Sequence, residues 1–121
     1  MSFAVTDAVS QVLASALDGV ALRQRVIADN IANVDTPGFR ASSVDFETQL
    51  KAAISDGSFT AGVDSVSATT VPTDTPVGAN GNNVDLRKET MAAVQSQFQY
   101  QILTRAVTER FDLVKTAAGA L

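Results

Sequence analysis

Apolar residues recur along the first third of the chain with the spacing of a long helix. Two interleaved sets repeat every seven residues: Leu13, Val20, Ile27 and Val34, and Leu17, Gln24 and Ile31. This alternating four-three spacing is typical of a coiled-coil seam, and the alternative is a helix packed on an ordinary core. Gln24 is the one polar member, and a polar residue in a seam costs stability while fixing register or partner number. We predict a helix from about Phe3 to Val34 whose seam faces another helix.

A second long helix is predicted from Val84 to Ala118. Asn83 or Asp85 is expected to cap its first turn, where negative charge suits the helix dipole. One apolar stripe runs along it, first through Met91, Val94, Phe98 and Ile102, and then through Leu103, Val107, Phe111, Val114 and Ala118. Each helix would be roughly 40 to 50 Å long. Two such helices bury only part of their apolar surface on each other, so the remaining stripes predict partners.

The segment from Ala41 to Ile54 is predicted to form a short helix. Ser42 and Asp45 have the spacing of a capping box, with Asp in place of Glu. Phe46, Leu50 and Ile54 then recur every four residues. The alternative is an extended segment, because Val44 and Phe46 also alternate.

Residues 55–83 change in composition toward Ser, Thr, Gly and Asn, with Pro72 and Pro76 in the middle. This composition predicts a flexible loop with at most a weak hairpin between Phe59 and Ala68. The predicted fold class is therefore all-α. Residues 1–34 and 84–121 form a paired, coiled-coil-like inner domain, residues 35–54 hold a turn and the short helix, and residues 55–83 form the loop.

The residues Thr36-Pro37-Gly38-Phe39 predict the turn that ends the first helix. Pro37 cannot continue a helix and pushes the residue before it toward extended geometry. Gly38 tolerates a positive φ, so these four residues predict a type II turn. An ordinary helix end would look the same, because Pro-Gly turns are common.

Composition excludes most chemistry for this chain of 121 residues. It has no His and no Cys, so thiolate and imidazole sites are absent; no acidic loop resembles a calcium site, and we expect no enzyme, cofactor or metal. Nine Lys plus Arg stand against thirteen Asp plus Glu without a basic run, which gives nucleic-acid binding no support. Charged and polar residues interrupt every apolar stretch, so no membrane insertion is expected, and no cleavable signal peptide is visible.

Two motifs resemble the rod and hook family of flagellar axial proteins, and within it the proximal rod proteins. The first comprises Asn30, Ile31, Ala32, Asn33, Thr36, Pro37, Gly38 and Phe39, followed by Arg40 and Ala41. The second runs from Gly81-Asn82-Asn83-Val84-Asp85-Leu86 to Gln97-Phe98-Gln99-Tyr100. Together they cover both helical ends and omit the variable middle.

The resemblance implies a structural subunit whose terminal helices pair and whose copies stack into a tube. It implies export through the flagellar type III apparatus without a cleaved signal, and a place in the periplasmic proximal rod, which joins the MS ring to the drive shaft. The implied partners are copies of itself, other rod proteins, the adaptor FliE and the MS-ring protein. The expected assembly surface comprises Leu13, Leu17, Val20, Gln24, Ile27, Ile31, Phe98, Leu103, Val107, Phe111 and Val114.

Two alternatives remain for the function at this point. One is another proximal rod protein, of the FlgC type. The other is a soluble coiled-coil adaptor or secretion chaperone, which should be folded and dimeric on its own.

Overall fold

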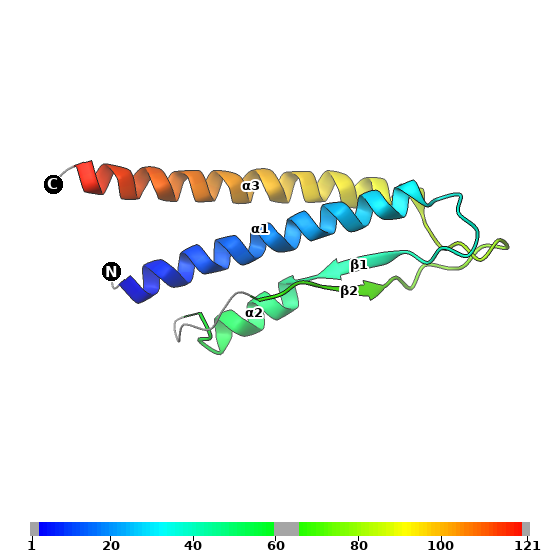
Figure 1. Ribbon diagram of the computed structural model, residues 1–121, viewed down its shortest axis with the longest axis horizontal. Helices are drawn as coiled ribbons and strands as arrows, with labels where there is room; N and C mark the ends of the chain where they lie inside the picture. Colours follow the sequence, from blue (N-terminus) through cyan, green and yellow to red (C-terminus); the bar gives the residue numbers. More distant parts are fainter. Residues whose placement is uncertain (1–2, 60–65, 120–121) are drawn as a thin grey trace.

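The computed structural model describes residues 3–59 and 66–119. Its elements are, in order, α1 (Phe3–Ala32), β1 (Ser42–Asp45), α2 (Glu47–Ser55), β2 (Thr69–Pro72) and α3 (Leu86–Gly119). Figure 1 shows three layers, with α1 between α3 on one side and the β1–β2 ribbon with α2 on the other. The free ends of α1 and α3 lie at the same end of the molecule, where the two helices diverge.

The two long terminal helices that the sequence predicts are confirmed. α1 has 30 residues and ends two residues before the predicted boundary at Val34. α3 has 34 residues and begins two residues after the predicted start at Val84. Asp85 caps α3, because its Oδ1 accepts a hydrogen bond of 3.1 Å from the backbone N–H of Lys88.

The predictions of an all-α fold and of a capping box at Ser42 are wrong. Ser42–Asp45 is a strand, β1, which pairs antiparallel with β2 so that Ser42 lies opposite Pro72 and Asp45 opposite Thr69. The extended alternative was the right one for these four residues. The strand is stable here because β2, whose residues pair with those of β1 across 24 to 30 positions of the chain, completes its hydrogen bonds, and a local pattern carries no information about that partner.

The predicted short helix exists from Glu47 onward, as α2. Its N-cap residue is Phe46, which offers no side-chain cap, and Asp45 just before it accepts a hydrogen bond of 3.3 Å at Oδ1 from the Thr48 N–H. Of the weak hairpin predicted between Phe59 and Ala68, residues 60–65 lie outside the described residues. Residues 66–68 have no regular structure, and β2 pairs with β1 instead.

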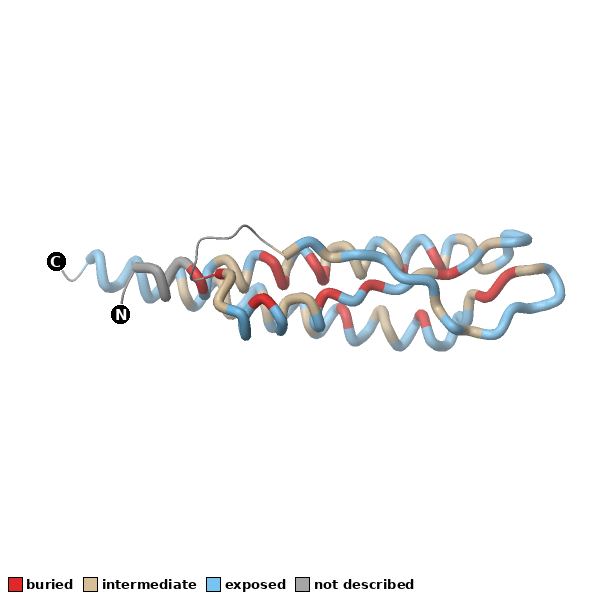
Figure 2. The backbone as a smooth tube through the Cα atoms, turned by 90° about the horizontal axis from the view of Figure 1, so that it is seen from below, coloured by how far each residue is buried: buried red, intermediate tan, exposed pale blue. Residues whose placement is uncertain are grey.

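The core lies where α1 meets β1 and α2. Ala16 and Val20 of α1 pack with Val44 of β1 and with Phe46, and Leu103 of α3 packs against this cluster. A second cluster, nearer the start of α1, joins Ala8, Ala53 and Phe59. Figure 2 shows that buried residues concentrate on these segments, whereas the last turns of α3 are exposed. α1 is thus the only long helix with packed neighbours on two sides in the described part of the chain.

Gly19 lets the Phe46 ring approach the backbone of α1. A Cβ on Gly19 would lie 2.4 to 2.8 Å from three atoms of that ring. Contacts this short do not occur between real atoms, so no larger residue fits here without displacing Phe46. A glycine inside a helix costs about 1 kcal/mol relative to alanine, and the close packing of an aromatic ring is what offsets that cost.

Candidate functional site

The two sequence motifs meet in space and form a single joint at the closed end of the helix pair. We call residues 30–41 and 80–85 the motif joint. The backbone N–H of Gly38 donates a hydrogen bond of 3.0 Å to the carbonyl of Asn80. The chains cross so closely that a Cβ on Gly81 would lie 3.2 Å from the Cα of Gly38. Two segments whose contacting residues, Gly38 and Asn80, lie 42 positions apart therefore fix each other.

The turn in the first motif has the predicted geometry. Gly38 has a φ of +77°, and the N–H of Phe39 donates to the carbonyl of Thr36 at 3.2 Å. Gly81, on the opposite segment, also has a positive φ, of +80°. Positive φ is nearly free for glycine and strained for other residues, so both crossing points of the joint require glycine.

Asn82 holds the turn from the other segment. Its Nδ2 donates hydrogen bonds of 2.8 Å to the carbonyls of Asn33 and of Thr36. Its Oδ1 accepts a hydrogen bond of 2.7 Å from the backbone N–H of Val84. The side chain is buried, and it satisfies backbone groups at the end of α1 and just before α3. One amide group thus ties the end of one long helix to the start of the other.

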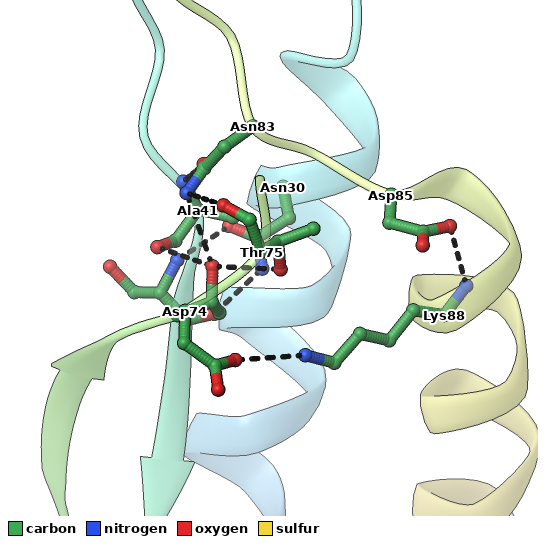
Figure 3. A network of polar contacts seen from close by, with 9 residues as sticks. Asn30, Ala41, Asp74, Thr75, Asn83, Asp85 and Lys88 are labelled. Atoms are coloured by element: carbon green, nitrogen blue, oxygen red, sulfur yellow. Dashed lines mark hydrogen bonds and ion pairs between the residues drawn. The ribbon is translucent and has the colours of Figure 1, made fainter. Parts of the chain in front are cut away.

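Asn83 and Asn30 hold the chain that leads into β1 (Figure 3). The Asn83 Oδ1 accepts a hydrogen bond of 2.6 Å from the Ala41 N–H. The Asn30 side chain pairs with both backbone groups of Ser42, donating to its carbonyl at 2.7 Å and accepting from its N–H at 3.2 Å. An amide that bonds both backbone groups of one residue replaces a neighbouring strand at that position. Asn30 therefore attaches the first residue of β1 to α1.

Arg23 connects all three layers of the fold. Its guanidinium forms two hydrogen bonds of 2.6 Å with the Glu47 carboxylate, one from each terminal nitrogen, and donates to the Val44 carbonyl at 2.7 Å. It also donates to Gln99 Oε1 on α3 at 3.0 Å and lies 4.8 Å from the centroid of the Phe46 ring. A planar guanidinium is suited to such a fork of acceptors beside an aromatic ring.

The Arg23–Glu47 pair predicts a pH dependence of stability. The hydrogen bonds from Arg23 hold the pKa of Glu47 below its ordinary value, and partial burial opposes this more weakly. A carboxyl with a lower pKa in the folded state stabilises the fold above its unfolded pKa, and that contribution is lost as pH falls through the folded value. Glu47→Gln should therefore cost about 1 kcal/mol or less at pH 7, since about half of the Glu47 side chain is exposed (48%).

Urea unfolding of the parent and of Glu47→Gln at pH 7 and at pH 3.5 tests this prediction. The difference in free energy of unfolding should shrink on acidification. A difference that is the same at both pH values would contradict the role of the ionised carboxylate. Gln49→Ala, on the same helix, serves as a control without a titrating group.

The seam residues of α1 are placed in two ways. Val20 and Ile27 are buried inside the chain, with 0% and 6% of their surface exposed, so their packing in this structure is intramolecular. Leu13, Leu17, Gln24 and Ile31 are only half-buried. Leu13 and Leu17 line a groove that opens between the diverging ends of α1 and α3. Whether the half-buried residues contact neighbours stays a prediction.

The predicted stripe of α3 is divided between two faces. Leu103 packs on the core, and Val107, Phe111 and Val114 follow it at helical spacing toward the groove. Phe98 lies on a different face, with Met91, Val94 and Ile102, because the step from Ile102 to Leu103 turns the helix by about 100°. The sequence pattern predicted a single stripe, whereas in the structure these residues lie on two separate faces of α3.

The outer face of α3 carries a row of large apolar side chains without a packed neighbour in the described chain. We call this row the outer stripe, and its four members and exposed fractions are Met91 (61%), Val94 (53%), Phe98 (60%) and Ile102 (67%). Such a contiguous exposed row on one helix face marks an interaction surface, whereas single exposed apolar residues need no explanation.

No group of three or more potential metal ligands occurs within residues 3–59 and 66–119. No helix in that part of the chain is long and apolar enough to cross a membrane. The features that stand out are instead a rigid joint at one end of the helix pair and apolar surfaces along it.

Sequence reasoning missed Arg23, and it did not assign partners to Asn82 and Asn83. The available signal for Arg23 was its place next to Gln24, the polar member of the seam. Its role could not be predicted from that place, because its hydrogen-bond acceptors come from β1, α2 and α3. For the asparagines the signal was their place beside Gly81 in the second motif. Their partners lie in the first motif, more than 40 residues away: Asn82 donates to the Asn33 carbonyl, and Asn83 accepts from the Ala41 N–H.

Comparison with known proteins agrees with the two motifs. Residues 11–40 match the family model described as Flagella basal body rod protein. The flagellar basal body rod protein FlgB of Bacillus subtilis is 35% identical over 88% of this chain and 89% of its own length. FlgB of Borreliella burgdorferi is 34% identical over 81% of this chain and 86% of its own length. FlgB of Escherichia coli is 32% identical over 84% of this chain and 86% of its own length.

The matches to these three relatives cover 81 to 88% of the chain and 86 to 89% of each relative. They confirm the resemblance to flagellar rod proteins that the two motifs indicated, and they do not favour the adaptor or chaperone alternative. The chain therefore belongs to the family of flagellar basal body rod proteins, and within it to the FlgB proteins.

Proposed function

We propose that this protein is a structural subunit of the proximal rod, the part of the flagellar basal body that joins the MS ring to the drive shaft. In this role it transmits torque through packed helices and helps to line the channel through which export substrates pass. The proposal is supported by membership of the FlgB family and by one structural observation, the exposed apolar surface along α3.

The mechanics of the proposal follow from the motif joint. In a subunit that carries torque, the angle between the long helices must not change under load, so these helices need a rigid connection. Asn82 supplies that connection through hydrogen bonds to backbone groups at the end of α1 and just before α3, while Asn30 and Asn83 hold the chain between α1 and β1. Because backbone groups rather than flexible side chains are held, the connection resists changes in the angle between α1 and α3.

The proposed partners are copies of this chain, other rod proteins, the adaptor FliE and the MS-ring protein. We place the subunit in the periplasmic rod and propose that it arrives through the flagellar export apparatus without cleavage of a signal peptide. The mass of the protein recovered from isolated basal bodies tests the last point, since cleavage would shorten the chain at its N-terminus.

Phe111→Ala is expected to leave the free chain almost unchanged but to impair rod assembly. Phe111 is 70% exposed in the single chain, where surface substitutions usually change stability by no more than about 0.5 kcal/mol. If neighbours enclose the ring in the rod, its loss should cost about 3 to 5 kcal/mol there. The measurement is the number of complete basal bodies in a strain whose only copy is the variant, with export of the subunit confirmed.

The matched control is Gln97→Ala, an exposed polar residue of the same helix. It should give basal bodies in parental numbers. Parental numbers with Phe111→Ala as well would remove Phe111 from the assembly surface. Failure of the unchanged chain to enter basal bodies at all would overturn the proposed function itself.

A further inference from the structure

A groove between the diverging ends of α1 and α3 is a further apolar surface that no other described segment of the chain fills. Leu13, Ala14 and Leu17 of α1 and Val107, Phe111 and Val114 of α3 line it, together with Ser10 and Arg110. We call it the end groove. Its volume is about 240 Å³. Small-molecule sites are usually larger, about 300 to 1,000 Å³, and contain several convergent polar groups.

The size of the end groove suits protein side chains better than a small molecule. An apolar cavity of about 150 Å³ holds a benzene molecule. The end groove therefore has room for one aromatic ring and part of an aliphatic side chain. It is also continuous with the interface already formed inside the chain, because Val107, Phe111 and Val114 extend the face of α3 on which Leu103 packs against the core.

The outer stripe supplies side chains of this kind at helical spacing. Met91, Val94, Phe98 and Ile102 follow the i, i+3, i+7, i+11 pattern with which a helix anchors in an apolar groove. No acidic or basic residue occurs between Glu89 and Arg105. A chain of net charge −4 repels its own copies, so an uncharged segment is the part of its surface that another copy can approach most closely.

We propose, resting on the proposed function, that the outer stripe of one copy inserts into the end groove of the next copy, with Phe98 as the anchor. Each copy then supplies the helix that the groove of its neighbour lacks. The two surfaces lie on different faces of α3 and at different heights along it, so the contact is head-to-tail. Such a contact repeats from copy to copy: it closes into a ring, or, where it does not close, it forms an open helix with a free stripe at one end and a free groove at the other.

The geometry also predicts the register between copies. Phe98 lies 13 residues before Phe111, roughly 20 Å along the helix. If neighbouring copies point the same way, placing Phe98 against Phe111 brings Val94 opposite Val107, which is also 13 residues away. Successive copies would thus be offset by roughly 20 Å along α3.

Disulfide crosslinking tests this register in a chain that has no cysteine of its own. The variant Val94→Cys/Val107→Cys places one thiol on the outer stripe and one in the end groove. The two thiols cannot bridge within one copy, because roughly 20 Å of helix separates them and a disulfide requires Cα atoms within about 7 Å. Basal bodies are isolated from cells in which this variant is the only copy, oxidised, and examined on a non-reducing gel.

We expect a ladder of disulfide-linked multimers of this chain. The matched control, Val94→Cys/Thr108→Cys, moves the second thiol one residue along and about 100° around the helix, and should give no ladder. Dimers formed by Val94→Cys alone would indicate a symmetric stripe-to-stripe contact and overturn the proposal. Crosslinks to a different rod component, identified by mass, would also overturn it.

The absence of any crosslink in basal bodies that contain the variant would overturn this contact while leaving the proposed function intact. By contrast, absence of the unchanged chain from basal bodies would remove the proposed function. The two failures are therefore distinguishable in the same preparation.

Discussion

Gly19→Ala is expected to destabilise the fold by about 3 kcal/mol, the upper part of the usual range for an overpacked core. The added methyl group would lie within 2.4 to 2.8 Å of the Phe46 ring. The ring cannot easily withdraw, because it packs with Val20 and Val44 in the core and lies beside the Arg23 guanidinium. Thermal or urea unfolding of the purified chain measures the change.

The predicted loss of stability at Gly19 is opposite in sign to the effect of the same substitution elsewhere in a helix. In an open helix position, replacing glycine by alanine stabilises by up to about 1 kcal/mol, because alanine has the higher helix propensity. Gly119→Ala is the matched control, since a Cβ there would meet no atom within 4 Å, and it should be neutral or slightly stabilising. If Gly19→Ala were as stable as the parent, the close packing of Phe46 on α1 would be wrong.

A second substitution separates the clash from other effects. Phe46→Leu removes the ring and should itself destabilise the core. Combined with Gly19→Ala, however, it should cost less than the sum of the two single changes, because the added methyl no longer meets the ring. Strictly additive costs would indicate that the two positions do not touch.

Asn82→Asp is expected to destabilise the fold by about 3 kcal/mol or more. The change keeps the shape of the side chain but replaces the amide nitrogen, which donates to the carbonyls of Asn33 and Thr36, by an oxygen. Two hydrogen bonds are lost, and an oxygen that cannot donate faces two carbonyl oxygens in a buried place, where each unsatisfied group costs about 1 to 3 kcal/mol.

The measurement is again urea unfolding of the purified chain, at pH 7 and at lower pH. Acidification protonates the introduced carboxyl, which can then donate one hydrogen bond, so part of the loss should be recovered. Asn80→Asp is the control, because Asn80 is exposed and the oxygen that accepts from the Asn82 N–H is retained. Equal effects of the two substitutions would contradict the role of Asn82 in the motif joint.

The two substitutions also probe different parts of the proposed mechanics. Gly19 and Phe46 hold the β1–β2 and α2 layer against α1, whereas Asn82 holds the closed end of the helix pair. If the motif joint sets the angle between α1 and α3, Asn82→Asp should reduce the number of complete basal bodies more than an equally destabilising change in the core.

The sequence by itself determined the features that depend on neighbouring residues. Both long helices were predicted to within two residues at their inner ends, because the apolar period of a helix and the signals that cap it are local. The turn at Pro37-Gly38 was predicted for the same reason: a fixed φ at proline and a free one at glycine restrict the backbone wherever they occur. The family resemblance followed from motifs that lie at these same helix ends.

Only the tertiary structure decided which distant groups meet. Ser42–Asp45 became a strand because β2 supplies its hydrogen bonds, although its local pattern also suited a helix start. Asn82, Asn83 and Arg23 acquired their roles from hydrogen-bond partners in other segments, which no local pattern encodes. The choice between the apolar faces of α3 was likewise tertiary. A helix with several apolar faces can pack by any of them, and the position of α1 left Met91, Val94, Phe98 and Ile102 exposed.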